Sequence, residues 1–352
     1  MFQAIEDVRI QWTKVVLPPV FLEEELPISE AAIATIFNAR LDISRILGQR
    51  DPRLLVLVGP CSIHDTKAAR EYAGLLRSAV TQFSADLHIV MRVFFEKPRT
   101  TIGWKGLIND PYLDQSYKIN DGLRLARHLL LDLAEMGVPT GTEFLDMISP
   151  QYVAGLVSWG AIGARTTESQ VHRQLASGLS MPIGFKNGTD GDVQVAVDAC
   201  RASGTSHTFF GVTPAGAAAV VTTAGNIDTH VILRGGRSGP NYSAEHVSKA
   251  LDLVSAVGLP RRLMVDASHG NSSKDYSRQP AVCTSLADQV TGGERGLIGV
   301  MMESFLVAGR QEPGDPATLT YGQSVTDACM DLSMTTGALE RLASSVARRR
   351  GL

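Results

Sequence analysis

The sequence predicts an α/β fold: a (β/α)8 TIM barrel that carries an N-terminal extension and an inserted β-hairpin. Short apolar runs alternate with amphipathic helical stretches over most of the chain, which is typical of parallel strands joined by helices. A length of 352 residues is normal for such a barrel with additions. The alternative is an open doubly wound sheet. It is disfavoured because no Gly-x-Gly-x-x-Gly follows the first predicted strand.

The first 50 residues are predicted to form an extension that precedes the barrel. Residues 15–19 (Val-Val-Leu-Pro-Pro) indicate extended chain broken by proline. Residues 29–47 have apolar side chains at helical spacing, and Ser29 is a suitable N-cap. The catalytic barrel is expected to occupy residues 51–352.

Eight strands are predicted within the barrel, and amphipathic stretches lie between most of them. The strands are Leu54–Val58, His88–Val93, Pro139–Glu143, Ala161–Ala164, Ile183–Lys186, Val231–Arg234, Leu263–Asp266 and Leu297–Met302. The clearest helical stretches are Lys67–Phe83, Gly122–Glu135 and Gln151–Ser158.

One segment interrupts this alternation. Two short apolar runs, His207–Val212 and Ala217–Thr223, flank a Thr-Pro-Ala-Gly turn and predict a β-hairpin at about residues 207–223. A hairpin is not needed to close a barrel. We therefore expect it to form an accessory surface for assembly or for a regulatory ligand.

Composition excludes several classes of protein. A formal net charge of −3 argues against sequence-independent binding of nucleic acid. The N-terminus lacks the apolar core of a signal peptide, and no apolar run is long enough to cross a bilayer. The four cysteines form no close-spaced framework. We expect a reduced cytoplasmic protein without a membrane or nucleic-acid partner.

Cationic side chains recur where predicted strands end. In a parallel barrel these carboxyl ends surround the active site, so the cations should face one cavity. Like charges repel in a buried site, and a cavity this basic is expected to bind an anion such as a phosphate or carboxylate. A single cation of this kind is more often part of a salt bridge. The five cations are Arg92, Lys97, Arg165, Lys186 and Arg234.

A second set of side chains has the chemistry of metal ligands. Cys61, His269 and Glu303 follow predicted strands, and we place Asp327 in the loop after the last helix. Mixed sulfur, nitrogen and oxygen donors suit a divalent transition metal: Mn, Fe, Co, Cu or Zn. Either Cys61 or His269 alone would more simply be a core residue. The remaining cysteines, Cys200, Cys283 and Cys329, are expected to be core residues within helices.

Several long motifs resemble a known family. They are Val58–His64 (VGPCSIH), Phe95–Thr101 (FEKPRTT), Ile162–Ser169 (IGARTTES), Gly184–Asp190 (GFKNGTD) and Leu233–Gly236 (LRGG). Together they are similar to the type I 3-deoxy-D-arabino-heptulosonate 7-phosphate (DAHP) synthases, and the similarity runs from about Asp51 to near the C-terminus. The resemblance implies the first step of the shikimate pathway, which leads to chorismate and the aromatic amino acids. In this step phosphoenolpyruvate condenses with D-erythrose 4-phosphate and inorganic phosphate is released.

The resemblance also implies roles for individual residues. The phosphoenolpyruvate site would contain Arg92, Lys97, Glu143, Ala164, Arg165, Lys186 and Arg234. Erythrose 4-phosphate would contact Lys97, Pro98, Arg99 and Thr100. The divalent metal would be held by Cys61, His269, Glu303 and Asp327. Lys97, Cys61 and His269 are the predicted catalytic residues, with Lys97 as the general acid.

The family further implies a homo-oligomer, a dimer or a tetramer, that is inhibited by an aromatic amino acid. By the same resemblance, residues 1–50 would make oligomer and regulatory contacts. The inhibitor pocket would include Met147, Gln151, Ser180, Phe209, Gly211 and Val221. Gly211 leaves more room than a serine would, which resembles the tyrosine-sensitive members. Tyrosine is therefore the predicted inhibitor.

Two other functions compete with this one. A 3-deoxy-octulosonate 8-phosphate synthase would use arabinose 5-phosphate on the same barrel, but the run from Lys97 to Thr100 argues against it. A sensor of phosphorylated ligands that has lost turnover would need neither the metal ligands nor Lys97.

Overall fold

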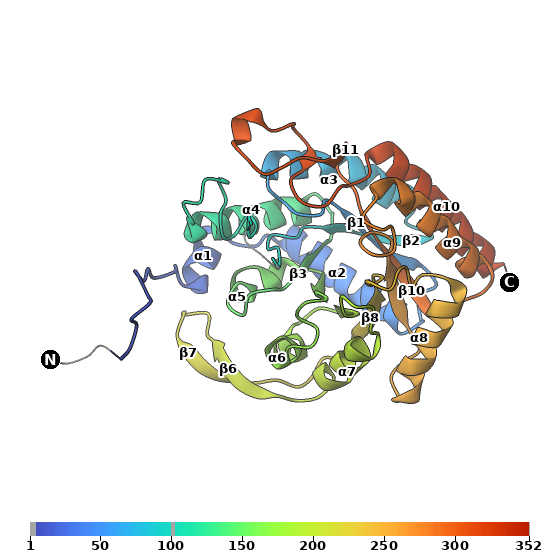
Figure 1. The fold of residues 1–352 in the computed structure, drawn as a ribbon, viewed down its shortest axis with the longest axis horizontal. Helices are drawn as coiled ribbons and strands as arrows, with labels where there is room; N and C mark the ends of the chain where they lie inside the picture. The colour runs from blue at the N-terminus through green and yellow to red at the C-terminus, as the bar shows by residue number, and fades with distance from the viewer. Residues whose placement is uncertain (1–4, 100–102, 352) are drawn as a thin grey trace.

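The computed structural model describes residues 5–99 and 103–351 and contains a closed barrel of eight parallel strands (Figure 1). The strand order around the barrel is β1-β10-β9-β8-β5-β4-β3-β2. The first strand pairs with both β2 and β10, so the open sheet is excluded. All eight predicted strands are present: β1 (Leu54–Gly59), β2 (Leu87–Arg92), β3 (Thr140–Glu143), β4 (Trp159–Ile162), β5 (Ile183–Lys186), β8 (Thr229–Leu233), β9 (Leu263–Asp266) and β10 (Leu297–Glu303).

Helices cover the outside of the barrel. They are α3 (Thr66–Gln82), α4 (Ile119–Glu135), α5 (Pro150–Val153), α6 (Gln170–Gly178), α7 (Gln194–Ser203), α8 (Ala244–Ala256), α9 (Gln279–Thr291) and α10 (Leu332–Arg350), with 3-10 turns at Ala154–Leu156, Tyr276–Arg278 and Pro316–Thr318. The helix predicted over Gln151–Ser158 is only one α-helical turn and one 3-10 turn, because the chain must enter β4 at Trp159. Among the described residues, no helix has both the length and the apolar character needed to cross a bilayer.

Two helices precede the barrel: α1 (Pro19–Glu25) and α2 (Glu30–Leu47). The Oγ of Ser29 accepts a hydrogen bond from the N–H of Ala32 at 3.3 Å, which confirms the predicted N-cap. Near its C-terminus, α2 buries Ile43, Ile46 and Leu47 in the cluster of side chains that fills the barrel. The end of the extension therefore closes the N-terminal end of the barrel.

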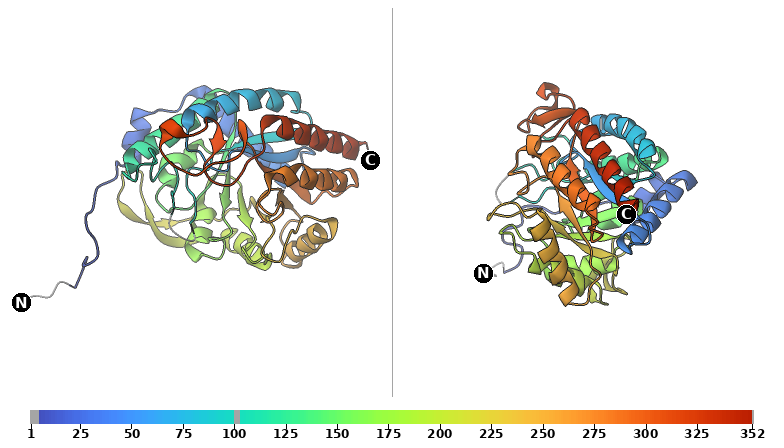
Figure 2. Two further views of the ribbon diagram at one scale, coloured as in Figure 1. Left: turned by 45° about the horizontal axis from the view of Figure 1, so that its top comes forward. Right: turned by 90° about the vertical axis from the view of Figure 1, so that its right-hand side faces the viewer.

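Residues 5–18 form an extended arm that leaves the body of the molecule (Figure 2). Several apolar side chains on it are exposed, including Ile5, Trp12 and Val15 at 88%, 68% and 84%. The arm meets the body at Leu17, whose N–H donates to Asn120 and whose carbonyl accepts from the Tyr152 hydroxyl at 2.6 Å.

The predicted hairpin is also confirmed. It consists of β6 (Thr208–Val212) and β7 (Ala218–Thr222), which pair antiparallel with each other outside the barrel. The barrel strands on either side of this insertion, β5 and β8, pair directly. A second small sheet, β11 (Val307–Arg310) and β12 (Gln323–Ser324), follows β10 and was not predicted.

All four cysteines are free and buried. Cys200 lies in α7 and Cys283 in α9, as predicted. Cys329 is a core residue as predicted, but its predicted place in a helix was wrong, because it precedes α10 and forms a β-bridge with Gly309. Its sulfur accepts a hydrogen bond from the N–H of Cys61 at 3.4 Å, which places it directly behind a predicted metal ligand.

Candidate active site and metal centre

A cavity of about 160 Å³ lies at the carboxyl ends of the barrel strands. Ten of the predicted site residues line it: Lys97, Pro98, Arg99, Glu143, Ala164, Arg165, Lys186, Arg234, His269 and Asp327. Gly163, Thr189, Lys274 and Thr326 line it as well and were not predicted to do so. Thr100, predicted to bind substrate, lies outside the described residues.

Arg92 does not line the cavity and is completely buried at the end of β2. Its Nη2 lies 3.2 Å from a carboxylate oxygen of Glu303, and its guanidinium carbon lies 4.0 Å from the centroid of the Phe94 ring. The ammonium groups of Lys97 and Lys186 lie 5.9 Å and 5.8 Å from the same centroid. The negative face of a ring favours such neighbours, so Phe94 helps to hold three cations together.

Asp266, at the end of β9, organises the opposite side of the site. Its carboxylate lies 3.2 Å from the Nζ of Lys186 and 2.9 Å from the Nδ1 of His269. It also accepts hydrogen bonds from the backbone N–H and the hydroxyl of Ser268. Burial acts to raise the pKa of Asp266, but His269 and Lys186 outweigh it and hold the pKa well below its usual range. The carboxylate is therefore charged and fixes two predicted site residues.

Lys97 reaches from the loop after β2 to a predicted metal ligand. Its Nζ donates to the carbonyl oxygen of Cys61 at 3.0 Å and lies 3.1 Å from the Cys61 sulfur. Burial acts to lower the pKa of Lys97, but the nearby Cys61, Glu303, Glu143 and Asp327 together raise it. The ammonium group is therefore protonated beside the sulfur.

Three of the four predicted metal ligands form one compact group. The ligand atoms of Cys61, Glu303 and Asp327 all lie within 4.8 Å of one another. The fourth, His269, has its Nε2 3.8 Å from a carboxylate oxygen of Glu303. Contrary to our placement, Asp327 lies before the last helix, because α10 begins only at Leu332.

The electrostatics of this group suit a cation. Burial raises the pKa of the Cys61 thiol to about 11, and the charge of Glu303 adds to the effect. A bound divalent cation reverses this balance, since a coordinating thiol is deprotonated. One sulfur, one imidazole and two carboxylates form the donor set of a transition metal. The residues present therefore fit such an ion.

The backbone at His269 is unusual. Its φ is 53°, in the left-handed region that side chains other than glycine seldom adopt. Its carbonyl accepts a hydrogen bond from the N–H of Lys274 at 2.7 Å, which closes the loop that carries both residues over the cavity. Such strain is concentrated at functional sites.

Glu143 ends β3 and is buried next to the cavity. Its Oε1 is buried and has no hydrogen-bond partner among the described residues. A Cβ at position 163 would lie 2.3 Å from this oxygen, so Gly163 leaves the space that the carboxylate occupies. A buried carboxylate oxygen without a partner is costly and is suited to a bound ligand.

A separate cavity of about 610 Å³ lies between the hairpin and α5–α6. All six residues predicted for the inhibitor pocket line it: Met147, Gln151, Ser180, Phe209, Gly211 and Val221. A Cβ at Gly211 would lie 2.7 Å from a methyl group of Val221, so the absence of a side chain there shapes the cavity.

The sequence interpretation did not assign roles to Asp266 or Phe94. Asp266 stands three residues before His269 at a strand end, and this position was the only available signal. The cations that it would pair with come from its own loop and from β5, two positions away in the barrel order. Phe94 looks like any apolar residue that ends a strand, so its contact with three cations becomes visible only in three dimensions.

Comparison with known proteins gives consistent matches. The model of the DAHP synthetase I family matches residues 26–340. The Phe-sensitive phospho-2-dehydro-3-deoxyheptonate aldolase of Escherichia coli K12 is 56% identical and covers 98% of this chain and 99% of its own. The Tyr-sensitive enzyme of that strain is 51% identical, over 96% of this chain and 95% of its own. The structure of phospho-2-dehydro-3-deoxyheptonate aldolase from Francisella tularensis SCHU S4 matches with a TM-score of 0.95 at 53% identity, covering 97% of this chain and all of that one.

Proposed function

Because this chain belongs to the DAHP synthetase I family and is an enzyme of the DAHP synthase class, we infer that it condenses phosphoenolpyruvate with erythrose 4-phosphate in a metal-dependent reaction. DAHP synthases catalyse the first step of aromatic biosynthesis. The observation that carries the substrate assignment is the cavity in which Lys97, Arg165, Lys186 and Arg234 converge. The assignments of individual residues below are part of this proposal.

The charges of the cavity match phosphoenolpyruvate. This substrate has a carboxylate and a phosphate on neighbouring atoms, and guanidinium groups bind both in a bidentate manner. Burial lowers the pKa of Arg234, so an anion that offsets this cost should bind firmly. Arg165, Arg234 and Lys186 would bind the anionic groups of phosphoenolpyruvate, while buried Arg92 supports Glu303 beneath them.

The aldehyde end of erythrose 4-phosphate would lie next to the metal centre, and its phosphate next to Arg99, which lines the outer cavity. Cys61, His269, Glu303 and Asp327 would hold the divalent ion. When bound, this ion polarises the aldehyde oxygen and makes the carbonyl carbon electrophilic.

In the reaction, C3 of phosphoenolpyruvate forms a bond to the aldehyde carbon, and the aldehyde oxygen takes up a proton. Water adds at C2, and the C2–phosphate bond breaks, which leaves the seven-carbon sugar acid phosphate and inorganic phosphate. Lys97 is the proposed proton donor to the aldehyde oxygen, because its ammonium group lies beside Cys61 and faces the cavity. Glu143, with its unpartnered oxygen, is one proposed group that would orient the water, and the alternative is that the metal centre would supply this activation.

The direct test is phosphate release from phosphoenolpyruvate in the presence of erythrose 4-phosphate, before and after chelation. We expect turnover that a strong chelator abolishes and added Mn²⁺ restores. Turnover that survives chelation would contradict the metal assignment alone. Activity with arabinose 5-phosphate but not with erythrose 4-phosphate would contradict the substrate assignment, and inactivity with both sugars would favour a sensor.

The hairpin cavity is the proposed inhibitor site, and tyrosine is the proposed inhibitor. A volume of about 610 Å³ is in the range of small-molecule sites, and the cavity is bounded by apolar side chains such as Phe209 and Val221. Gly211 supports tyrosine because it leaves more space than a serine would.

Inhibition by each aromatic amino acid tests this assignment. We expect tyrosine to inhibit most strongly and Gly211→Ser to shift the preference toward phenylalanine. Ala218→Ser is the matched control, because residue 218 lies on the same hairpin but is exposed and does not line the cavity. Tyrosine having the weakest effect on the unmodified protein would contradict the assignment.

A homo-oligomer, either a dimer or a tetramer, is also proposed. Exposed apolar side chains lie on the arm, on the outer face of α2 at Ile33, Phe37 and Leu41, and on the hairpin at Phe210, which is 90% exposed. A second copy of the chain would cover these surfaces. A solution mass equal to that of a single chain would contradict this proposal and the proposed contacts of residues 1–50.

We propose the cytoplasm as the location of the protein. Four free, buried cysteines support a reducing compartment. Retention of activity under thiol-reducing conditions is expected, and its loss would contradict the proposal.

A further inference from the structure

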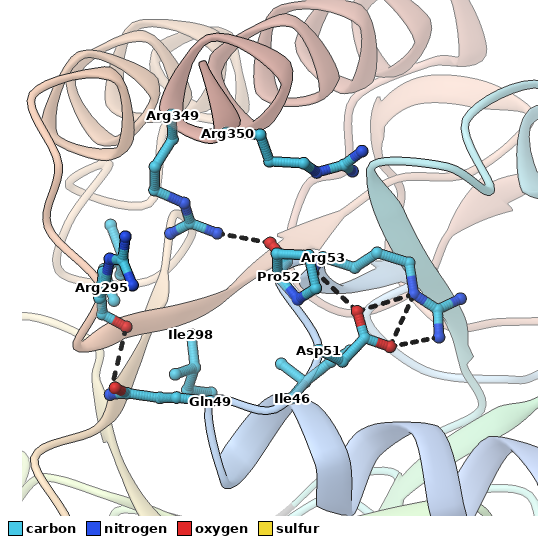
Figure 3. Close-up of a pocket in the computed structure, with 10 residues that line it drawn as sticks. Ile46, Gln49, Asp51, Pro52, Arg53, Arg295, Ile298, Arg349 and Arg350 are labelled. Atoms are coloured by element: carbon cyan, nitrogen blue, oxygen red, sulfur yellow. Dashed lines mark hydrogen bonds and ion pairs between the residues drawn. The ribbon is translucent and has the colours of Figure 1, made fainter. Parts of the chain in front are cut away.

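At the opposite end of the barrel from the active-site cavity, a smaller cavity of about 120 Å³ lies where β1 and β10 begin (Figure 3). Its walls come from the end of α2, the segment that leads into β1, the start of β10 and the end of α10. Four arginines and one acidic residue, Asp51, line it, so the cavity is strongly basic.

Two of these arginines are fully engaged by carboxylates. Arg53 lies 2.6 Å from Asp51 and 2.9 Å from Asp42. Arg350 lies 2.7 Å from Asp86. In Figure 3 both side chains point away from the space between Arg349 and Ile298. Their charges are therefore balanced within the protein.

Arg349 lacks such a partner. Its guanidinium donates to the carbonyl oxygens of Pro52 at 2.7 Å and Glu294 at 3.3 Å, and it forms no ion pair with any residue that the structure describes. An arginine in the last turn of a helix commonly caps the carbonyls of that helix. Here both acceptors belong to other segments, so capping of α10 does not account for the position of this side chain.

Of the four arginines that line this cavity, Arg295 is the second without a carboxylate partner among the described residues. Its side chain is exposed, and only its backbone carbonyl is engaged, by the amide of Gln49 at 3.5 Å. The neighbouring Glu294 carboxylate faces elsewhere, since it pairs with Arg261 at 3.0 Å and accepts from the N–H of Gly296. Burial lowers the pKa of Arg349, and the charges of Arg295 and Arg350 lower it further, while the charge of Glu294 partly opposes them. The two guanidinium groups thus repel each other across the cavity.

We propose that Arg295 and Arg349 bind a small tetrahedral oxyanion of the inorganic phosphate class in this cavity. An anion between two guanidinium groups replaces their repulsion with charge-assisted hydrogen bonds. At about 120 Å³ the cavity is small, and it has room for a single phosphate. The bound anion would join the start of β10 to the end of α10 and, through Pro52, to the start of β1.

The experiment is calorimetric titration of inorganic phosphate into the full chain at low ionic strength. The test variant is Arg295→Gln. The matched control is Arg77→Gln, an exposed arginine on α3. Each variant is also made in an Arg234→Gln background. The Arg234→Gln background weakens phosphate binding in the active-site cavity, so the two sites are distinguished without any measurement of turnover.

We expect the Arg295→Gln variant to bind one phosphate fewer per chain, or to bind it at least about tenfold more weakly, in both backgrounds, whereas Arg77→Gln changes nothing. A tenfold change corresponds to about 1.4 kcal/mol, the lower limit for a charge-assisted hydrogen bond. Arg295→Lys should retain weakened binding, and it serves as the second variant if the glutamine variant is destabilised in phosphate-free buffer. The KM for phosphoenolpyruvate should be unaffected by Arg295→Gln. Equal phosphate binding by the Arg295 and Arg77 variants would overturn the proposal, as would acetate binding as tightly as phosphate.

Discussion

Replacing Asp266 with asparagine removes the charge that holds two site residues. The fully buried carboxylate lies 3.2 Å from Lys186 and 2.9 Å from His269. Asparagine has almost the same shape and can still accept hydrogen bonds from Ser268. The change therefore isolates the loss of charge, which leaves Lys186 buried without a carboxylate beside it.

The size of the expected loss in stability follows from the burial of both Asp266 and Lys186. Breaking a buried ion pair by removing one partner costs about 3–5 kcal/mol. Because the amide retains part of the hydrogen bonding, we expect the free energy of unfolding to fall by about 3 kcal/mol. Loss of the carboxylate behind a metal-ligating histidine typically costs about 10–100-fold in activity or metal affinity. We expect a loss of that size in turnover.

Urea denaturation and phosphate-release assays measure the two effects, with Asp288→Asn on the exposed face of α9 as the matched control. A double-mutant cycle with Lys186→Met identifies the cause. If the buried lysine is the main source of the cost, the double variant should be less destabilised than the sum of the single variants by at least about 1 kcal/mol. Strictly additive effects would refute the reasoning, as would an Asp266 variant as stable as the control.

Three further changes have defined outcomes. Lys97→Met should lower turnover by about 10²–10⁴-fold because it removes the proposed proton donor, whereas Lys249→Met on exposed α8 should not alter the rate of phosphate release. Burial raises the pKa of Glu96 from 4.5 to about 7, so the folded protein keeps this proton up to a higher pH than the unfolded chain does. The free energy of unfolding should therefore decrease as the pH rises from about 4.5 to about 7. Glu96→Gln should remove this decrease and be more stable than the unmodified protein by about 2 kcal/mol at pH 8 in thermal unfolding; an equal advantage at pH 4 would contradict this explanation. Asn226→Ala should cost about 2–3 kcal/mol in urea denaturation, because the Asn226 amide donates to three backbone carbonyls near α6, while Asn38→Ala on exposed α2 should cost almost nothing.

The barrel could be predicted because its strands are apolar on both faces. Runs such as Leu54–Val58 and Leu297–Met302 are buried along their whole length, so a continuous apolar run signals these strands, whereas β3 (Thr140–Glu143) has no such run. The convergence of the cationic side chains on one cavity could also be predicted, since the ends of parallel strands meet at one end of a barrel. The hairpin was recognisable from its turn.

Other features depend on contacts that no local pattern encodes. The strands β11 and β12 are short and only partly apolar, and their pairing forms across a long loop. The place of Cys329 beside Cys61 results from the path of the chain between β10 and α10. The partners of Asp266 come from its own loop and from a strand two positions away in the barrel order. Sequence reasoning identifies such a carboxylate but not the charges that it balances.

The insertion of the hairpin between α7 and β8 leaves the pairing of β5 with β8 intact. The proposed active site is thus built from the barrel, whereas the hairpin that borders the proposed inhibitor cavity is a separate stretch of the chain. Substitutions in residues 208–222 would change the proposed inhibitor cavity without altering a barrel hydrogen bond or a proposed metal ligand. If the hairpin cavity binds an inhibitor as proposed, its preference could change by substitution within the insertion while the barrel and the proposed catalytic residues stay the same.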